Sequence, residues 1–300
     1  MDLWIPVTLA AAAFQTVRFL LQKVLATQTL SPAGATFARF IYALPFVFLL
    51  LILYLGVSAQ ALPSLARSFW SFGLLGALSQ ILATVCVVSL FKARNFAVGI
   101  TFKKTETIHT VLVGWILLGE GVSAFGFAAI ALGILAVLLL SSGPEAKGMK
   151  LAHLTNRAAA LGLASGLLFA FSAVSYRGAT FAVASDDALL RALVTLAAVV
   201  AMQTLMMVLW LRLREVGEIT AVWQARRVAV WIGLTSMAGS LCWFIAFALQ
   251  NAAYVKALGQ IELLLSVAAT TFFFHERITG KELAGMAILM ASICTLIFVI

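Results

Sequence analysis

The sequence contains little charge. Only 10% of its 300 residues are Asp, Glu, Lys or Arg, whereas 63% are hydrophobic, and the mean hydropathy is +1.09. A soluble domain needs a polar surface, and this composition does not supply one. Long apolar runs with few charges are typical of helices that cross a lipid bilayer. We therefore expect an all-α membrane protein and exclude a soluble fold.

Cysteine and histidine are also scarce. The residues are Cys86, Cys242 and Cys294, and His109, His153 and His275. The cysteines lie in apolar runs without a CxxC spacing, and the histidines are far apart, so we expect no metal site and no disulfide framework. A convergent set of catalytic side chains is missing as well, so we expect neither an enzyme nor a cofactor.

Acidic residues are outnumbered. The 11 Asp and Glu face 20 Lys and Arg, which gives a formal net charge of +9. In a soluble protein this excess would suggest nucleic acid as a partner. In a membrane protein it is explained by basic cytoplasmic loops beside anionic lipid. We therefore exclude nucleic acid and expect the lipid bilayer as a partner.

What the sequence does contain is a series of long apolar windows. A spanning helix needs about 20 mostly apolar residues. Ten windows qualify: 3–21, 33–55, 70–90, 97–118, 124–141, 158–180, 188–211, 229–250, 252–274 and 282–300. The longest polar connections, 142–157 and 212–227, leave no room for a soluble domain.

The two halves of the chain resemble each other. A shift of 156 residues pairs Glu106 with Glu262 and Glu120 with Glu276. Chance is a poor explanation for these pairs, because the chain contains so few acidic residues. We predict two five-helix repeats, 1–142 and 158–300, joined by the loop 143–157. An odd number of helices per repeat gives the two repeats opposite orientations, as in the inverted repeats of secondary transporters.

The loop charges favour this inversion. Most basic loop residues lie in the odd-numbered connections: Lys23, Lys92, Arg94, Lys147, Lys150, Arg157, Arg212, Arg214, Arg226, Arg227, Arg277 and Lys281. The even-numbered connections carry little beyond Arg67 and Arg177. The positive-inside rule then predicts that the odd connections are cytoplasmic and that both termini lie outside.

Two segments resemble a known family. "LLGEGVSAFGFAAIALGILAVLLLSS" (117–142) and "FHERITGKELAGMAILMASICTLIFV" (274–299) are similar to the boundary before the last helix of an EamA repeat. EamA proteins are ten-helix members of the drug/metabolite transporter superfamily. The family tends to have a Glu-Pro step fourteen residues before the boundary glutamate. Here Glu106 and Glu262 occupy that position, but neither is followed by a proline. The sequence therefore does not predict the family's helix kink at these two points.

The resemblance implies a multi-pass carrier of the bacterial inner (plasma) membrane. It would export a small organic metabolite, such as an amino acid, by alternating access through a cavity lined mainly by helices 1, 3, 4, 6, 8 and 9. No ATP-binding loop is present, so protons or an exchanged solute would supply the energy. A flippase for a lipid or lipid-linked sugar, or an exporter of organic cations or drugs, is the alternative. Many family members have cytoplasmic termini, whereas the loop charges here favour the opposite orientation.

The fourth window contains the charged stretch "GITFKKTETIHT" (99–110). A charge at the bilayer centre costs about 2.5–3.5 kcal/mol on insertion scales. Lys103 and Glu106 are three residues apart and can pair on one helix face. They are therefore either a structural pair, with Lys104 reaching the interface, or part of a wet cavity where Lys103 or Lys104 binds an anionic solute. The excess of lysine favours a solute with a carboxylate or phosphate.

Further polar residues lie in the predicted spans. The candidates for substrate binding or coupling are Lys103, Lys104, Glu106, Gln80, Thr84, His109, Tyr176, Trp243, Gln260 and Glu262. Structural charge anchors are expected at Arg39, Arg191, Glu120 and Glu276. Glu106 and Glu262 are candidate proton sites. Gln260 corresponds to Lys104 in the repeat, so the two halves differ chemically. Lys256 stands near a predicted helix start and can either reach the interface or join this group.

Overall fold

The structure is a computed structural model that describes residues 2–90, 103–140, 157–265 and 280–299. This described part is almost entirely helical. It contains no β-strand, and only an isolated antiparallel bridge joins Leu65 to Val183. The predicted all-α class is therefore confirmed.

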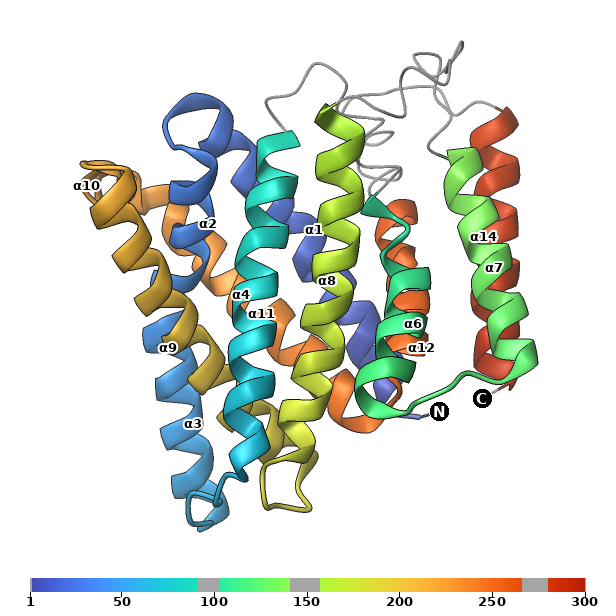
Figure 1. Ribbon diagram of the computed structural model, residues 1–300, viewed down its shortest axis with the longest axis horizontal. Helices are drawn as coiled ribbons and strands as arrows, with labels where there is room; N and C mark the ends of the chain where they lie inside the picture. Colours follow the sequence, from blue (N-terminus) through green and yellow to red (C-terminus); the bar gives the residue numbers. More distant parts are fainter. Residues whose placement is uncertain (1, 91–102, 141–156, 266–279, 300) are drawn as a thin grey trace.

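The helices stand side by side in a bundle (Figure 1). They are α1 (Trp4–Gln28), α2 (Pro32–Ile41), α3 (Leu44–Ser58), α4 (Arg67–Leu90), α6 (Glu106–Leu118), α7 (Ala124–Leu140), α8 (Arg157–Phe181), α9 (Ala188–Arg214), α10 (Glu218–Gln224), α11 (Arg226–Leu249), α12 (Ala252–Leu258), the 3-10 helix η3 (Gly259–Ile261) and α14 (Gly280–Val299). The helices α7 and α14 pair at one edge, and the two chain termini lie at the same end of the bundle (Figure 1).

In the described part, six segments are long and apolar enough to span a membrane, and one of them contains both α2 and α3. They are Trp4–Gln28, Pro32–Ser58, Arg67–Leu90, Ala160–Phe181, Ala188–Arg214 and Arg226–Leu249. Shorter apolar helices cover Glu106–Leu118, Ala124–Ala136 and Leu283–Thr295. Parts of the fourth and ninth predicted spans, 97–102 and 266–274, lie outside the described residues. The long apolar helices are compatible with an integral membrane protein.

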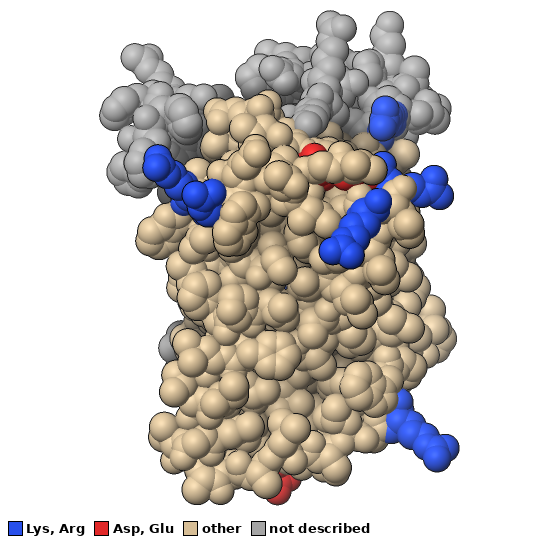
Figure 2. Space-filling view, turned by 90° about the vertical axis from the view of Figure 1, so that its left-hand side faces the viewer, with Lys and Arg blue, Asp and Glu red and all other residues tan. Residues whose placement is uncertain are grey.

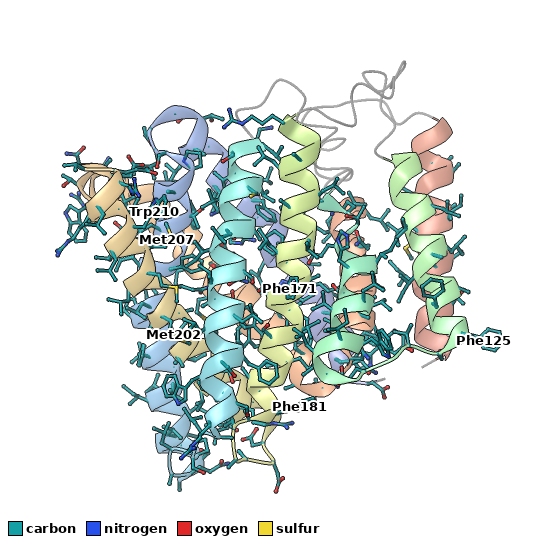
Figure 3. All side chains as sticks on the ribbon, in the orientation of Figure 1. Phe125, Phe171, Phe181, Met202, Met207 and Trp210 are labelled. Atoms are coloured by element: carbon teal, nitrogen blue, oxygen red, sulfur yellow. The ribbon has the colours of Figure 1, made fainter. Side chains whose placement is uncertain are left out.

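The outer surface of the bundle is apolar. Phe125 of α7 is 72% exposed and points away from the bundle, and Trp210 of α9 is 52% exposed (Figure 3). Cys294 is exposed on α14. Large exposed apolar patches are unfavourable in water but are the normal surface toward lipid, where helices satisfy their own backbone hydrogen bonds.

Exposed basic side chains gather at one end of the bundle (Figure 2). In the described part they lie at the end of α1, the start of α8, the end of α9 and the start of α11: Lys23, Arg157, Arg212, Arg214, Arg226 and Arg227. These helix ends lie on one side of the bundle, opposite the chain termini (Figure 1). Arg67, at the start of α4, is exposed at the other end.

The second predicted span, 33–55, is divided into α2 and α3. Ser31 caps α2 by accepting a hydrogen bond from the backbone N–H of Gly34 at 2.9 Å, and Pro32 follows at the first helical position. Both residues are typical of a helix start. Pro45 lies in the first turn of α3 and has no N–H for a helical hydrogen bond. A proline inside a helix therefore breaks it, and the interruption falls at Tyr42 and Ala43.

The bundle is built from close helix pairs. Helix α4 packs on α8, α1 packs on α11, and α7 packs on α14, while α6 contacts both α8 and α12. At the α4–α8 contact, Gly76 faces the ring of Tyr176, and a Cβ atom at Gly76 would lie 2.5 Å from that ring. Small residues at such contacts let helix backbones approach closely within a membrane.

Replacing Gly76 with Ala is expected to destabilise the protein by about 1–3 kcal/mol, because the buried Tyr176 ring must move to make room. The change is measured as a lower melting temperature of the detergent-purified protein. Gly56→Ala is the matched control, since nothing lies within 4 Å of a Cβ atom there and Ala has the higher helix propensity. An unchanged melting temperature for Gly76→Ala would contradict the close α4–α8 contact.

Asp187 caps helix α9 outside the apolar segment. Its carboxylate accepts hydrogen bonds from the N–H groups of Leu189 at 2.9 Å and Leu190 at 3.3 Å, and from the Tyr54 hydroxyl. The pKa of Asp187 lies below its usual range, mainly because its carboxylate accepts the hydrogen bond from Tyr54. A carboxyl group whose pKa is lower in the folded state stabilises the fold above its unfolded pKa, about 3.9. That stabilisation is lost as the pH falls through the folded pKa.

Stability is therefore expected to fall below about pH 4 in the wild type and to depend less on pH in Asp187→Asn, which keeps a capping oxygen. Asp187→Ala removes the cap and is expected to cost about 1 kcal/mol at neutral pH. Melting curves between about pH 3 and 7 test both expectations. The same pH dependence in Asp187→Asn and the wild type would show that another group is responsible.

Candidate functional site

The candidate site lies where α6 and α12 meet, at an interruption in each segment. Helix α6 begins at Glu106 after a turn, and α12 ends at Leu258 and continues as the 3-10 helix η3. Neither interruption contains a proline. Gly166 of α8 permits the close approach of the first segment, since a Cβ atom there would lie 2.9 Å from the Lys103 carbonyl oxygen.

Three lysines and two glutamates form ion pairs at this place. Lys103 Nζ lies 3.6 Å from Glu106 Oε2, and Lys256 Nζ lies 2.7 Å from Glu106 Oε1. Lys104 Nζ lies 3.8 Å from Glu262 Oε2. The local pair predicted from the spacing of Lys103 and Glu106 is therefore present, but it is one contact in a larger network that joins both halves of the chain.

If Lys103 and Glu106 were only a structural pair, Lys104 was expected to reach the interface. The structure instead buries Lys104. Its side chain is only 6% exposed and pairs with Glu262, which also accepts a hydrogen bond from Gln15 Nε2 at 2.8 Å. Long charged side chains commonly carry their charged group to water. Here Glu262, the residue after η3, lies within ion-pairing distance, and Lys104 stays in the interior.

Two buried arginines add to the positive charge. Arg18 donates to Gln22 Oε1 at 2.6 Å, and its guanidinium lies 4.1 Å from the centre of the Phe19 ring. Arg39 donates to the hydroxyl groups of Ser236, Thr84 and Ser240. In the described part of the chain, neither guanidinium has a carboxylate within 4.0 Å. The interior group thus consists of Arg18, Arg39, Lys103, Lys104 and Lys256 against Glu106 and Glu262. These charges sum to three positive units.

Lys256 is further surrounded by aromatic rings. Its ammonium lies 4.5 Å from the ring centre of Trp243, 5.8 Å from that of Phe247 and 5.9 Å from that of Phe169. Such cation–π contacts contribute about 2 kcal/mol or more each when they are desolvated. Together with Glu106 they hold this ammonium in the centre of the site.

Two small adjoining chambers lie beside these groups. The lysine chamber is lined by Lys103, Lys104, Glu106, Gly259, Gln260 and Glu262, and the arginine chamber by Arg39, Gln80, Ser172, Tyr176, Ser240 and neighbouring apolar residues. Gln15, Trp243 and Lys256 line both chambers. The space open to water is about 10 Å³ in the first and about 20 Å³ in the second. Each has room for about one water molecule, so an organic solute does not fit in this conformation.

A hydrogen-bond network fixes the wall of the arginine chamber. The Tyr176 hydroxyl donates to Gln80 Oε1 at 3.0 Å, and Gln203 Nε2 donates to Gln80 Oε1 at 2.8 Å and to the Tyr176 oxygen at 3.0 Å. Two polar atoms near the chambers lack partners among the described residues, namely Trp243 Nε1 and Gln260 Oε1. Buried polar atoms normally have a partner, so both are available to water or a ligand.

Most of the residues predicted from the sequence come together here. Lys103, Lys104, Glu106, Gln80, Tyr176, Trp243, Gln260 and Glu262 all line a chamber. Thr84 lines neither chamber but accepts a hydrogen bond from Arg39 at 3.2 Å. His109 of α6 also lines neither, and its Nδ1 has no hydrogen-bond partner in the described part.

The predicted charge anchors have different surroundings. Arg39 was expected to be a structural charge anchor, and it lines the arginine chamber. Arg191 lies away from both chambers, with its guanidinium 5.8 Å from the centre of the Phe181 ring. Glu120 pairs with Arg177. Glu276 lies outside the described residues.

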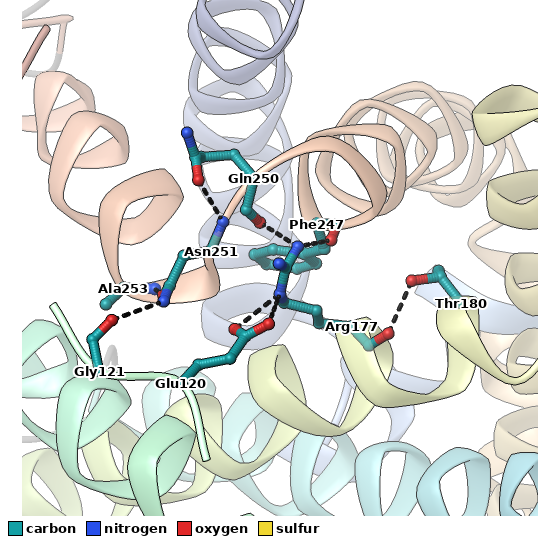
Figure 4. A network of polar contacts seen from close by, with 8 residues as sticks. All are labelled: Glu120, Gly121, Arg177, Thr180, Phe247, Gln250, Asn251 and Ala253. Atoms are coloured by element: carbon teal, nitrogen blue, oxygen red, sulfur yellow. Dashed lines mark hydrogen bonds and ion pairs between the residues drawn. The ribbon is translucent and has the colours of Figure 1, made fainter. Parts of the chain in front are cut away.

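Figure 4 shows the contacts of Arg177. Its Nε donates to both Glu120 oxygens, at 2.8 and 2.7 Å, and its Nη1 donates to the carbonyl oxygens of Phe247 at 2.6 Å and Gln250 at 2.5 Å. These carbonyls belong to the C-terminal end of α11, which has no helical donors for them. Arg177 therefore joins α8, the loop after α6 and the end of α11.

The sequence interpretation gave too little weight to Gln15, Arg18, Arg177 and Lys256. It treated Arg177 as a loop charge and did not select the other three for the site. The signal was present in each case, because a polar or charged residue within an apolar helix marks a site or a partner. The partners of Gln15, Arg177 and Lys256 were not visible, because each lies in another segment of the chain. In the described residues, no cluster of three His, Cys, Asp or Glu could hold a metal ion.

Comparisons with known proteins give information on the fold alone. No family model and no curated protein matches the chain. Among solved structures, 28 chains are similar. One of them, titled "Crystal structure of protein", has a TM-score of 0.70 and 14% sequence identity, and the match covers 99% of this chain and 96% of that one. At this identity the similarity demonstrates a shared fold over nearly the whole chain and does not indicate a substrate.

Proposed function

We propose that this chain is a secondary transporter that exports a small organic metabolite bearing a carboxylate or phosphate, such as an amino acid, by alternating access. The observation that carries the proposal is the convergence of buried lysines and glutamates at the interruptions of α6 and α12. Charges inside a membrane are costly and mark solute or ion pathways. Interrupted helices that present such groups are typical of transporter binding sites.

Helix packing supports an arrangement of two inverted five-helix repeats, 1–142 and 158–300. Under the shift of 156 residues, α4 corresponds to α11 and α8 to α1, so the α4–α8 contact corresponds to the α11–α1 contact. The pair of α7 and α14 corresponds to itself. A two-fold relation between the halves explains this pattern. We propose on this basis, and on the resemblance of 117–142 and 274–299, that the chain is a ten-helix EamA-type member of the drug/metabolite transporter superfamily.

The ion pairs support a transport cycle that depends on charge exchange. Each chamber has room for about one water, so this conformation is closed around paired charges. An entering anion would compete with Glu106 and Glu262 for the positive charges of the site. Protonation of either glutamate would release its lysine in the same way. A proton gradient or an exchanged solute would then drive the cycle, because charge exchange changes which conformation is favoured.

Transport in proteoliposomes tests the function. Labelled glycine, succinate and glycerol 3-phosphate are offered as anionic or zwitterionic solutes, and tetramethylammonium as a cation. We expect saturable accumulation of at least one of the first three, lost in the Lys103→Met/Lys104→Met double variant and kept in Lys23→Met, whose lysine is exposed at the end of α1. Transport of the cation alone, unaffected in the double variant, would overturn the proposal.

The proposed orientation places the basic end of the bundle in the bacterial cytoplasm and both termini outside the plasma membrane. It follows from the basic residues at that end and the positive-inside rule. A C-terminal alkaline phosphatase fusion is expected to be active, since its disulfides form only outside the cytoplasm, and a green fluorescent protein fusion at the same place is expected to be dark. The reverse pattern would contradict this orientation.

A second candidate is a lipid or lipid-linked sugar flippase. An apolar groove of about 440 Å³ lies between α2, α4 and α9, and its lining includes Met207, Trp210 and Glu215 (Figure 3). Its apolar walls suit an acyl chain. Mass spectrometry of lipids that co-purify with the protein, followed by a translocation assay with a labelled lipid, distinguishes this function from solute transport.

A further inference from the structure

We propose that the arginine chamber is an oxyanion-binding subsite, in which Arg39 and the indole N–H of Trp243 bind a carboxylate or phosphate of the solute. The inference rests on the proposed function and makes it more specific. It assigns the anionic end of the solute to Arg39, at the contact of α2, α4 and α11, and not to the lysine pairs of α6.

Among the described residues, none supplies a counter-ion for the charge of Arg39. Its side chain is only 4% exposed. The guanidinium donates to Ser236 Oγ at 2.8 Å, Thr84 Oγ1 at 3.2 Å and Ser240 Oγ at 3.4 Å. Hydroxyl groups orient a guanidinium but do not neutralise it, and a buried charge without a counter-charge is strongly unfavourable. The planar fork of arginine suits the paired oxygens of a carboxylate or phosphate.

Trp243 supplies an independent indication. Its side chain is buried, its Nε1 has no acceptor among the described residues, and it lines the same chamber. An indole N–H can only donate. The neighbouring Gln80 Oε1 already accepts hydrogen bonds from Tyr176 and Gln203. A carboxylate or phosphate of a ligand would accept a hydrogen bond from the indole N–H and at the same time balance the charge of Arg39.

The two chambers differ in acidity. Glu106 and Glu262 line the lysine chamber and pair with its lysines, whereas none of the lining residues of the arginine chamber is acidic. Lys256 lines both chambers and is already paired with Glu106. The arginine chamber is therefore the part of the described site where an anion gains a positive partner without displacing a carboxylate of the protein.

Binding of succinate and glycerol 3-phosphate to the detergent-purified full chain tests the assignment, by isothermal titration calorimetry. Succinate reports on carboxylates and glycerol 3-phosphate on phosphates. We expect at least one to bind, with affinity about 30-fold weaker in Arg39→Gln and about 10-fold weaker in Arg39→Lys, which keeps the charge but not the fork. Trp243→Phe keeps an aromatic ring and loses the donor, and is expected to weaken binding about 5-fold.

Matched controls separate the subsite from general electrostatics. Arg191→Gln removes a partly buried charge that lines neither chamber, and is expected to change affinity less than about 3-fold. Trp231 lies on the same helix as Trp243 but is 60% exposed, and Trp231→Phe is expected to have no effect. Equal losses in Arg191→Gln and Arg39→Gln would overturn the subsite, since only the summed charge would matter.

The outcomes distinguish the two proposals. Wild-type binding that survives Arg39→Gln but is lost in Lys103→Met/Lys104→Met overturns the subsite and supports the proposed function. No binding of either anion by the wild type overturns both. Should neither Arg39 variant fold, Trp243→Phe decides the question, because unchanged affinity in that variant contradicts the assignment.

Discussion

Glu106→Gln is expected to abolish solute transport and to lower the free energy of unfolding by about 3–5 kcal/mol. Glu106 is the common partner of two ammonium groups, Lys103 Nζ at 3.6 Å and Lys256 Nζ at 2.7 Å. Glutamine has nearly the same shape, so packing is kept while the negative charge is lost. Both lysines then remain in the protein interior without that counter-charge, which is the costly way to break a buried ion pair.

Thermal unfolding in detergent and uptake by proteoliposomes measure the two effects separately. Glu106→Gln/Lys256→Met is the informative second variant, because it removes one of the ammonium groups left unpaired. Its loss of stability is expected to be smaller than the sum of the two single changes, since contacting residues do not contribute additively. Transport is expected to remain absent. Wild-type stability and transport in Glu106→Gln would contradict an ionised Glu106 in this structure.

Arg177→Leu is expected to lower the free energy of unfolding by about 3 kcal/mol, near the lower limit for breaking a buried pair. The change leaves the Glu120 carboxylate and the carbonyl oxygens of Phe247 and Gln250 without their donor. The lower limit applies because the Glu120 side chain is 22% exposed and water can partly replace the guanidinium. The loss should be visible as a lower melting temperature in detergent.

Two comparisons make this expectation specific. Arg67→Leu removes an exposed arginine at the start of α4 and is expected to change stability by less than about 0.5 kcal/mol. Arg177→Leu/Glu120→Leu removes both charges and is expected to be less destabilising than the two single changes added together. If Arg177→Leu and Arg67→Leu melted alike, the network in Figure 4 would contribute nothing to the stability of the fold.

Glu106→Gln and Arg177→Leu each remove a buried charge, but the two charges have different surroundings in the bundle. The Arg177 network joins helix ends and closes hydrogen bonds that would otherwise be unmade. The group around Glu106 has more positive than negative charges, and its chambers contain polar atoms without partners. A balanced pair is sufficient for structure, whereas an unbalanced group is suited to binding a charged solute.

The sequence by itself determined the class of the fold. The apolar windows in the described part are helical, although 33–55 and 252–274 are interrupted, and the seventh predicted span, 188–211, corresponds to α9 (Ala188–Arg214). The reason is that backbone groups in lipid must be satisfied within one segment, so apolar length alone selects helices. The Lys103–Glu106 pair was also predictable, because residues three apart share a helix face.

Only the tertiary structure decided how the buried charges are partnered. Lys104 pairs with Glu262 and Lys256 pairs with Glu106, and each pair joins residues far apart in the chain. The position of Arg39 in a chamber wall was missed for the same reason. Spacing in the sequence fixes which side chains share one helix face. Which helices approach each other is fixed by close packing at small residues such as Gly76 and Gly166, and that packing selects the partner of each charge.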